Sequence, residues 1–157
     1  MKNPNLAQWV DPPCWRLSPP SDFCEFLREL PNFVPENSTL ALEGTGAYDI
    51  ESYLQDRPAK YENETDQGFW KMSPKVFYMS VTLENLRGLA DLSERYNELE
   101  VCSHLRVFSN DQIILSWHDL PFDPIYISNR FDEVSLKKVC DVLGCESLSY
   151  AATEKGL

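Results

Sequence analysis

The side chains best suited to chemistry stand together in the run Ser116-Trp117-His118-Asp119. Serine, histidine and aspartate are the residue types of a nucleophilic triad. Adjacent side chains on a strand point to opposite faces, so Ser116 and His118 would share a face while Asp119 points away. The chain also has no Gly-x-Ser-x-Gly elbow. We therefore interpret the run as a strand end, where His118 and Asp119 bind the backbone of the turn at Pro121. A small enzyme that uses His118, Asp119 and Ser116 is the alternative.

Cys102 and His104 indicate a second chemistry, either a Cys/His dyad or a pair of metal ligands. They stand two residues apart on a predicted strand and so share a face. A zinc site needs about four ligands, however. If the hairpin pairs Ser109 with Gln112, His104 and His118 lie on opposite faces and cannot meet at one metal. We predict a buried thiol and a hydrogen-bonded histidine, and no catalytic residue, metal or cofactor.

Two further motifs also favour structural interpretations. The sequence Glu43-Gly44-Thr45-Gly46 lies between a predicted strand and a predicted helix, but it lacks the Lys-Ser/Thr ending of a phosphate loop. Five cysteines, an odd number with no Cys-x-x-Cys, do not suggest a disulfide framework. Cys140 falls on the apolar stripe of the predicted last helix and Cys145 follows its end, with no basic residue near Cys145 to lower its pKa.

Charge is the strongest feature of the sequence. The formal net charge is −11, and residues 36–70 hold eight acidic and two basic side chains. This balance argues against binding to nucleic acid or to an anionic membrane, because both require clustered Lys and Arg. Acidic groups between aromatic ones suit a surface that docks onto a basic protein. A solvated helix face beside a loop, or a calcium site, would account for the same residues. The predicted partner-binding residues are Asp49, Glu51, Tyr53, Asp56, Tyr61, Glu62, Glu64, Asp66 and Trp70.

Hydrophobic periodicity predicts a single α+β domain. Helices are expected near residues 21–30, 47–55, 82–96 and 132–143, and strands near 39–42, 76–81, 101–108, 112–117 and 125–127. They would form a mixed sheet of about five strands that ends in an antiparallel meander, with helices covering mainly one face. Residues 1–20 form a Pro- and Trp-rich N-terminal arm, residues 21–146 the domain, and residues 147–157 a frayed tail.

These patterns favour a binding protein over an enzyme. No signal peptide or apolar run of membrane-spanning length is visible, and the free thiols indicate a cytoplasmic protein. The most concrete expectation is an immunity-type protein whose acidic surface occludes a basic partner such as a cationic toxin or nuclease. A structural or adaptor protein acting through the N-terminal arm is a third alternative.

Overall fold

The computed structural model describes residues 10–59 and 76–151, which hold seven strands and five helices. The strands are β1 (Cys14–Leu17), β2 (Thr39–Glu43), β3 (Val76–Ser80), β4 (His104–Ser109), β5 (Gln112–Trp117), β6 (Ile125–Ser128) and β7 (Leu148–Ala151). The helices are α1 (Phe23–Phe33), α2 (Tyr48–Gln55), α3 (Leu83–Ser93), α4 (Glu98–Val101) and α5 (Glu133–Leu143).

The strands form one sheet in the order β3-β2-β4-β5-β6-β1-β7, and every pairing is antiparallel. The α+β class is confirmed, but the expected five strands are seven in the described residues, and the expected mixed sheet is antiparallel. The helical connections explain the second difference. The α3–α4 connection joins β3 to β4 across β2, and α5 joins β6 to β7 across β1. Each crossover skips one strand, and the skipped strand runs antiparallel to both of its neighbours.

The sheet extends beyond the expected boundaries of the domain. Cys14–Leu17, within the segment predicted to be an arm, is an inner strand that pairs with β6 on one side and β7 on the other. Leu148–Ala151, within the segment predicted to be frayed, pairs with β1. Four residues are too few to show a clear two-residue period, and the flanking prolines conceal β1 further.

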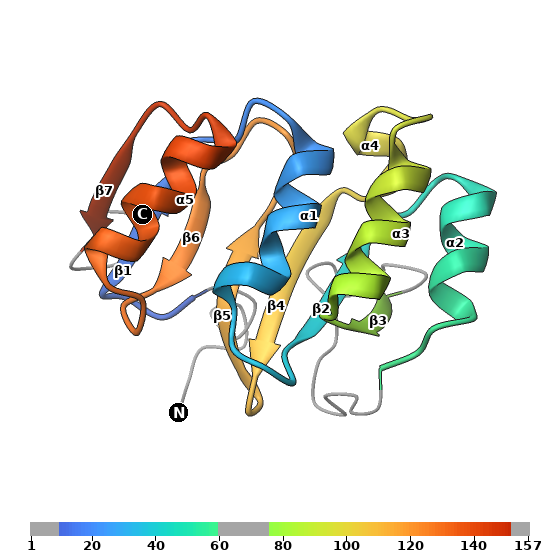
Figure 1. Ribbon diagram of the computed structural model, residues 1–157, viewed down its shortest axis with the longest axis horizontal. Helices are drawn as coiled ribbons and strands as arrows, with labels where there is room; N and C mark the ends of the chain where they lie inside the picture. The colour runs from blue at the N-terminus through green and yellow to red at the C-terminus, as the bar shows by residue number, and fades with distance from the viewer. Residues whose placement is uncertain (1–9, 60–75, 152–157) are drawn as a thin grey trace.

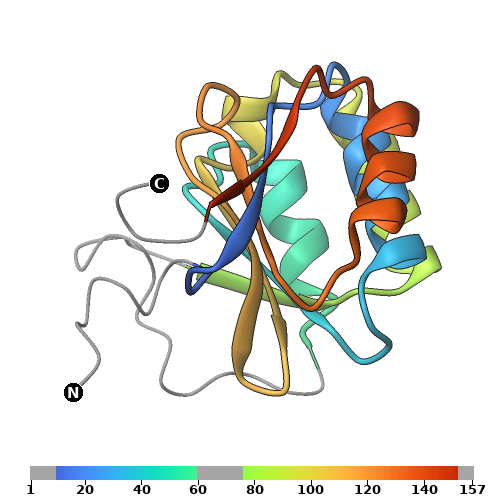
Figure 2. The same ribbon diagram turned by 90° about the vertical axis from the view of Figure 1, so that its left-hand side faces the viewer.

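The long helices lie side by side on one face of the sheet (Figures 1 and 2). That face is apolar, and the core between the layers includes Leu42, Leu105 and Trp117, all with essentially no exposure. Trp117 meets the ring of Phe26 from α1 edge-on, with centroids 5.1 Å apart. Burial of such side chains is worth about 1.5–3 kcal/mol each, so this layer supplies most of the driving force for folding.

Side-chain caps set the start of three of these helices. The carboxylate of Asp22 accepts hydrogen bonds from the backbone N–H groups of Cys24 and Glu25 at the start of α1. Thr82 caps α3 and Asp132 caps α5 in the same way. Such caps satisfy N–H groups that have no partner within the helix, and each contributes about 1 kcal/mol.

Candidate functional site

Four of the predicted partner-binding residues lie in the part of the chain that the structure describes, and all four are on α2 or at its end. Asp49 and Asp56 are exposed, while Glu51 and Tyr53 are half-buried. The other five predicted residues lie outside the described residues: Tyr61, Glu62, Glu64, Asp66 and Trp70. The structure therefore places the N-terminal part of the predicted surface on one helix.

Tyr53 packs between α2 and α3. Its hydroxyl donates a hydrogen bond to the backbone oxygen of Asn85 on α3, at 2.9 Å. Its ring lies so close to Gly88 that a Cβ there would be 2.1 Å from the hydroxyl. Arg57 covers the ring, 3.9 Å from its centroid. Tyr53 thus joins α2 to α3.

Tyr48, by contrast, is 81% exposed at the start of α2. The buried stripe of α2 is Ala47, Ile50 and Leu54. At about 100° per residue, Tyr48 lies well outside that stripe, roughly 130° from its middle. Helical spacing alone could therefore have identified Tyr48 as the outward-facing tyrosine of this helix.

An acidic surface extends from α2 over α3 and α4, and we call it the acidic helix surface. Its carboxylates are Asp49, Glu51, Asp56, Glu84, Asp91, Glu94, Glu98 and Glu100. Within residues 47–59 and 82–101 there are three arginines and no lysine. The exposed apolar side chains of Tyr48 and Leu99 lie on the same helices, α2 and α4.

Direct contacts hold the acidic helix surface together. The Tyr96 hydroxyl donates a hydrogen bond to the Asp49 carboxylate at 2.9 Å, and this bond raises the pKa of Tyr96. The backbone N–H groups of Gly46 and Ala47 both donate to the Glu100 carbonyl, at 3.0 and 3.2 Å. These bonds fix the start of α2 against α4, so their carboxylates keep a defined arrangement.

Arg28 of α1 forms ion pairs with two carboxylates of the acidic helix surface. Its guanidinium contacts Glu25 at 2.8 Å, and Asp91 and Glu94 at 2.9 Å each. The hydrogen bonds that Arg28 donates to Asp91 and Glu94 raise its pKa further above its already high value. One cation thus serves three carboxylates, and the local charge remains negative.

A small hollow opens beside Arg28, between the start of α1 and the α3–α4 connection. Its volume is about 240 Å³. Three carboxylates of Asp22, Glu94 and Glu98 line it together with the rings of Tyr96 and Trp117. Carboxylates beside aromatic rings provide the surroundings that Lys and Arg side chains prefer.

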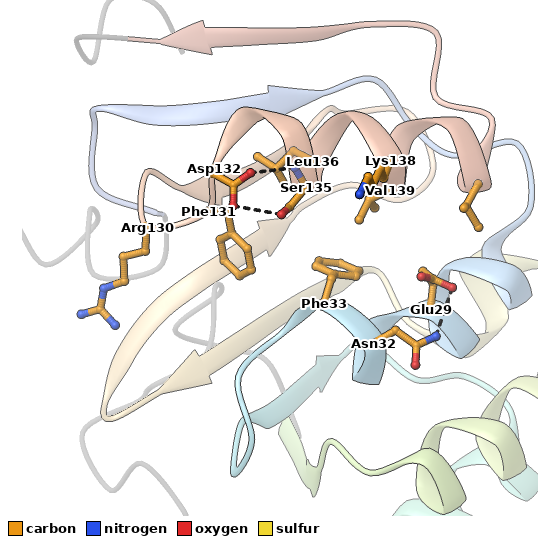
Figure 3. Close-up of a pocket in the computed structure, with 11 residues that line it drawn as sticks. Glu29, Asn32, Phe33, Arg130, Phe131, Asp132, Ser135, Leu136, Lys138 and Val139 are labelled. Atoms are coloured by element: carbon orange, nitrogen blue, oxygen red, sulfur yellow. Dashed lines mark hydrogen bonds between the residues drawn. The ribbon is translucent and has the colours of Figure 1, made fainter.

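A second and larger hollow, the α1–α5 groove, has a different character. Its volume is about 430 Å³, and Phe33 and Phe131 face each other across it with ring centroids 6.1 Å apart (Figure 3). The Asp132 carboxylate is engaged with the backbone N–H and the hydroxyl of Ser135, and the Asn32 amide donates to Glu29. These four polar groups of the groove are thus paired with one another, and its lining contains no histidine or cysteine.

The two histidines, which we expected on opposite faces, lie together on the sheet face opposite the helices. Their ring centroids are 5.3 Å apart, and both side chains are buried. Ser109 does pair with Gln112, as expected, but a bulge at Val107/Phe108 shifts the register by one residue. A one-residue shift moves every following side chain to the other face, which brings His118 beside His104.

His104 is held in one hydrogen-bonded form. Its Nδ1 accepts a hydrogen bond from the backbone N–H of Asp119 at 3.1 Å, which places the proton of the neutral ring on Nε2. Burial lowers the pKa of His104 and outweighs the nearby Glu43 and Asp119 carboxylates, which act in the opposite direction. The backbone of Asp119, in the left-handed region with φ of 50°, thus binds His104.

Other polar side chains are buried on the same sheet face as the two histidines. Arg106, Ser116 and Tyr126 occupy facing positions on β4, β5 and β6. Ser116 Oγ accepts a hydrogen bond from the backbone N–H of Val10, at 3.4 Å. Neither hollow reported above is lined by Ser116 or His118. In residues 10–59 and 76–151, no group of three or more metal-ligating side chains has a geometry that could hold a metal.

None of the helices in the described residues is long and apolar enough to cross a membrane. Comparisons with models of known families, with curated proteins and with solved structures gave no significant match.

Proposed function

We propose that the protein is an acidic binding or inhibitory protein of the cytoplasm. Its most concrete form is an immunity-type protein that occludes a basic partner such as a cationic toxin or nuclease. The acidic helix surface carries this proposal. The segments that bear its eight carboxylates contain no lysine, and the exposed ring of Tyr48 lies on one of its helices, α2.

Such a surface supports both steps of association. Charges of one sign attract a partner of the opposite sign over roughly a Debye length, about 8 Å at physiological salt, and raise the association rate. Exposed aromatic and apolar side chains then supply buried area once the partner docks. Tyr48 and Leu99 would take that role beside Asp49, Glu98 and Glu100.

The hollow lined by Asp22, Glu94 and Glu98 adds a specific docking point. A Lys or Arg side chain of the partner that enters it would meet carboxylates on its charged end and the partly exposed ring of Tyr96 along its stem. Inhibition would follow from occupation of a basic cleft and requires no chemistry from this chain.

The test is capture from the native host with matched variants. The acidic-surface variant carries Asp49→Asn, Glu98→Gln and Glu100→Gln. The control variant carries Glu133→Gln, Asp141→Asn and Glu146→Gln, which removes equal charge from α5 and the turn after it. We expect wild type and the control variant to retain the same basic protein, and the acidic-surface variant to lose it.

Activity provides the second readout. The captured protein, expressed alone, should impair growth or show an activity such as nuclease cleavage, and co-expression of this chain should suppress that effect. An acidic or neutral partner retained equally by all three forms would contradict the proposal. So would a basic partner whose activity is unchanged by saturating amounts of this protein.

A further inference from the structure

Two thiols meet where α5 ends. Gly144 adopts the left-handed conformation with φ of 66°, and its N–H donates to the Cys140 carbonyl. The N–H of Cys145 donates to the same carbonyl at 3.0 Å. This is the geometry of a Schellman-type helix end, in which the side chains of the first and last residues of the motif contact each other. Here those two side chains are cysteines.

This helix end brings the two cysteines together: the backbone bond joins Cys145 to Cys140, and both side chains belong to or pack against the same apolar core. Cys140 is buried on the core side of α5, while Cys145 is only partly buried. The pair thus has one thiol that an oxidant can reach and a second thiol already beside it.

The same corner joins two parts of the chain. Ser21 contributes its N–H and its hydroxyl to the carbonyl of Leu143, at 3.1 and 3.2 Å. Ser18 and Ser147 exchange two hydrogen bonds of 3.0 Å. The turn from α5 into β7 is therefore fastened to the connection between β1 and α1 (Figure 1).

We propose that Cys140 and Cys145 form a reversible disulfide, and that this bond is a redox-dependent clamp on the corner that leads into β7. The oxidant is a low-molecular-weight disulfide such as oxidised glutathione. The Cys145 thiolate attacks one of its sulfurs, forms a mixed disulfide and releases one glutathione thiolate. Cys140 then attacks the Cys145 sulfur and expels the second glutathione.

The balance of this exchange is complete. Two thiols lose two electrons to the oxidant, the glutathione disulfide is cleaved, and the two thiol protons end on two glutathione thiols. Burial raises the pKa of Cys145 to about 12, and also raises that of Cys140. The reactive thiolate is consequently scarce at neutral pH, and the initial rate should rise about tenfold for each pH unit toward 9.

The test uses the folded full chain, oxidised glutathione as the probe and Cys24 as an internal control. Cys24 is partly buried, and burial and nearby carboxylates raise its pKa to about 11. After oxidation, an acid quench and alkylation in denaturant, tryptic peptide mapping separates Cys24 from the peptide of residues 139–155, which holds both Cys140 and Cys145. We expect that peptide to be unalkylated and lighter by two hydrogen atoms, whereas Cys24 is alkylated or carries glutathione.

Variants and reversal sharpen the result. Cys140→Ser should leave glutathione trapped on Cys145, Cys24→Ser should leave the internal disulfide unchanged, and dithiothreitol should restore both thiols. The oxidised protein should also melt on the order of a few °C higher. Full alkylation of both Cys140 and Cys145 in oxidised wild type would overturn the proposal, as would a stable glutathione adduct on Cys145 in wild type. The wild-type map decides even if a serine variant folds poorly.

Discussion

The two ends of the helical layer differ in charge although they share one sheet and one core. At one end, α2, α3 and α4 carry the acidic helix surface; residues 47–59 and 82–101 hold three arginines and no lysine, and Arg28 of α1 contacts two of the carboxylates. At the other end, the acidic groups of α5 are balanced by Lys137 and Lys138, and Glu133 pairs with Lys137 at 3.3 Å. Solubility alone would not require this segregation, so the difference indicates a directional surface.

The largest expected effect is on association. Against the basic partner that the proposed capture experiment would identify, the variant Asp49→Asn/Glu98→Gln/Glu100→Gln should associate about tenfold or more slowly than wild type at low salt. The control variant on α5 should associate at the wild-type rate within a factor of about two. Stopped-flow or surface-based kinetics over a range of salt concentrations gives both numbers. Equal losses of association rate in the two variants would show that the acidic helix surface and α5 contribute equally to binding.

The two tyrosines of α2 divide binding from stability. Tyr53→Ala should destabilise the protein by about 2 kcal/mol, because it removes the packing against α3 and the hydrogen bond to Asn85. Tyr48→Ala should change stability by less than about 0.5 kcal/mol but weaken binding. Urea unfolding and partner titration measure the two effects. A large stability loss for Tyr48→Ala would show that its exposed position is incorrect.

A smaller effect is expected where α1 meets α3. Arg28→Met removes a partly exposed cation from three carboxylates and should cost about 1 kcal/mol or less at low salt. The cost should shrink as salt screens the carboxylates that remain. Urea unfolding at two ionic strengths tests this, and a salt-independent loss would mean that Arg28 acts through packing instead.

The smallest effect concerns salt and the folded state. Because the acidic helix surface concentrates like charges, wild type should melt slightly higher in about 0.5 M NaCl than at low salt. The acidic-surface variant should show a smaller increase than the control variant, by on the order of 1–2 °C. Parallel thermal melts are sufficient, and identical increases would mean that the two ends experience similar repulsion.

Long helices and strands with a clear hydrophobic period could be predicted from the sequence, but the register of the sheet could not. The helices at α3 and α5 and the β4–β5 hairpin follow from apolar spacing, capping residues and turn residues. The bulge at Val107/Phe108 has no comparable local signal, because it depends on how two strands twist against each other. The one-residue shift at this bulge places His118 on the same sheet face as His104. The expectation that the two histidines lie on opposite faces is therefore wrong.

The candidate site was predictable in charge but not in detail. Composition alone located the acidic segment, since charge needs no knowledge of packing. The roles of Tyr48 and Tyr53 depend on which face of α2 meets α3, and the contribution of α3 and α4 depends on the position of Glu100 beside the start of α2. The meeting of Cys140 and Cys145 follows from the left-handed Gly144, which the sequence marks only as a helix end.

Amide hydrogen exchange of the complex with the basic partner tests the central claim most directly. The account predicts slower exchange on binding in residues 48–55 and 94–101, with the residues of α5 unchanged. Protection confined to α5 and the α1–α5 groove, with α2 and α4 unaffected, would contradict it.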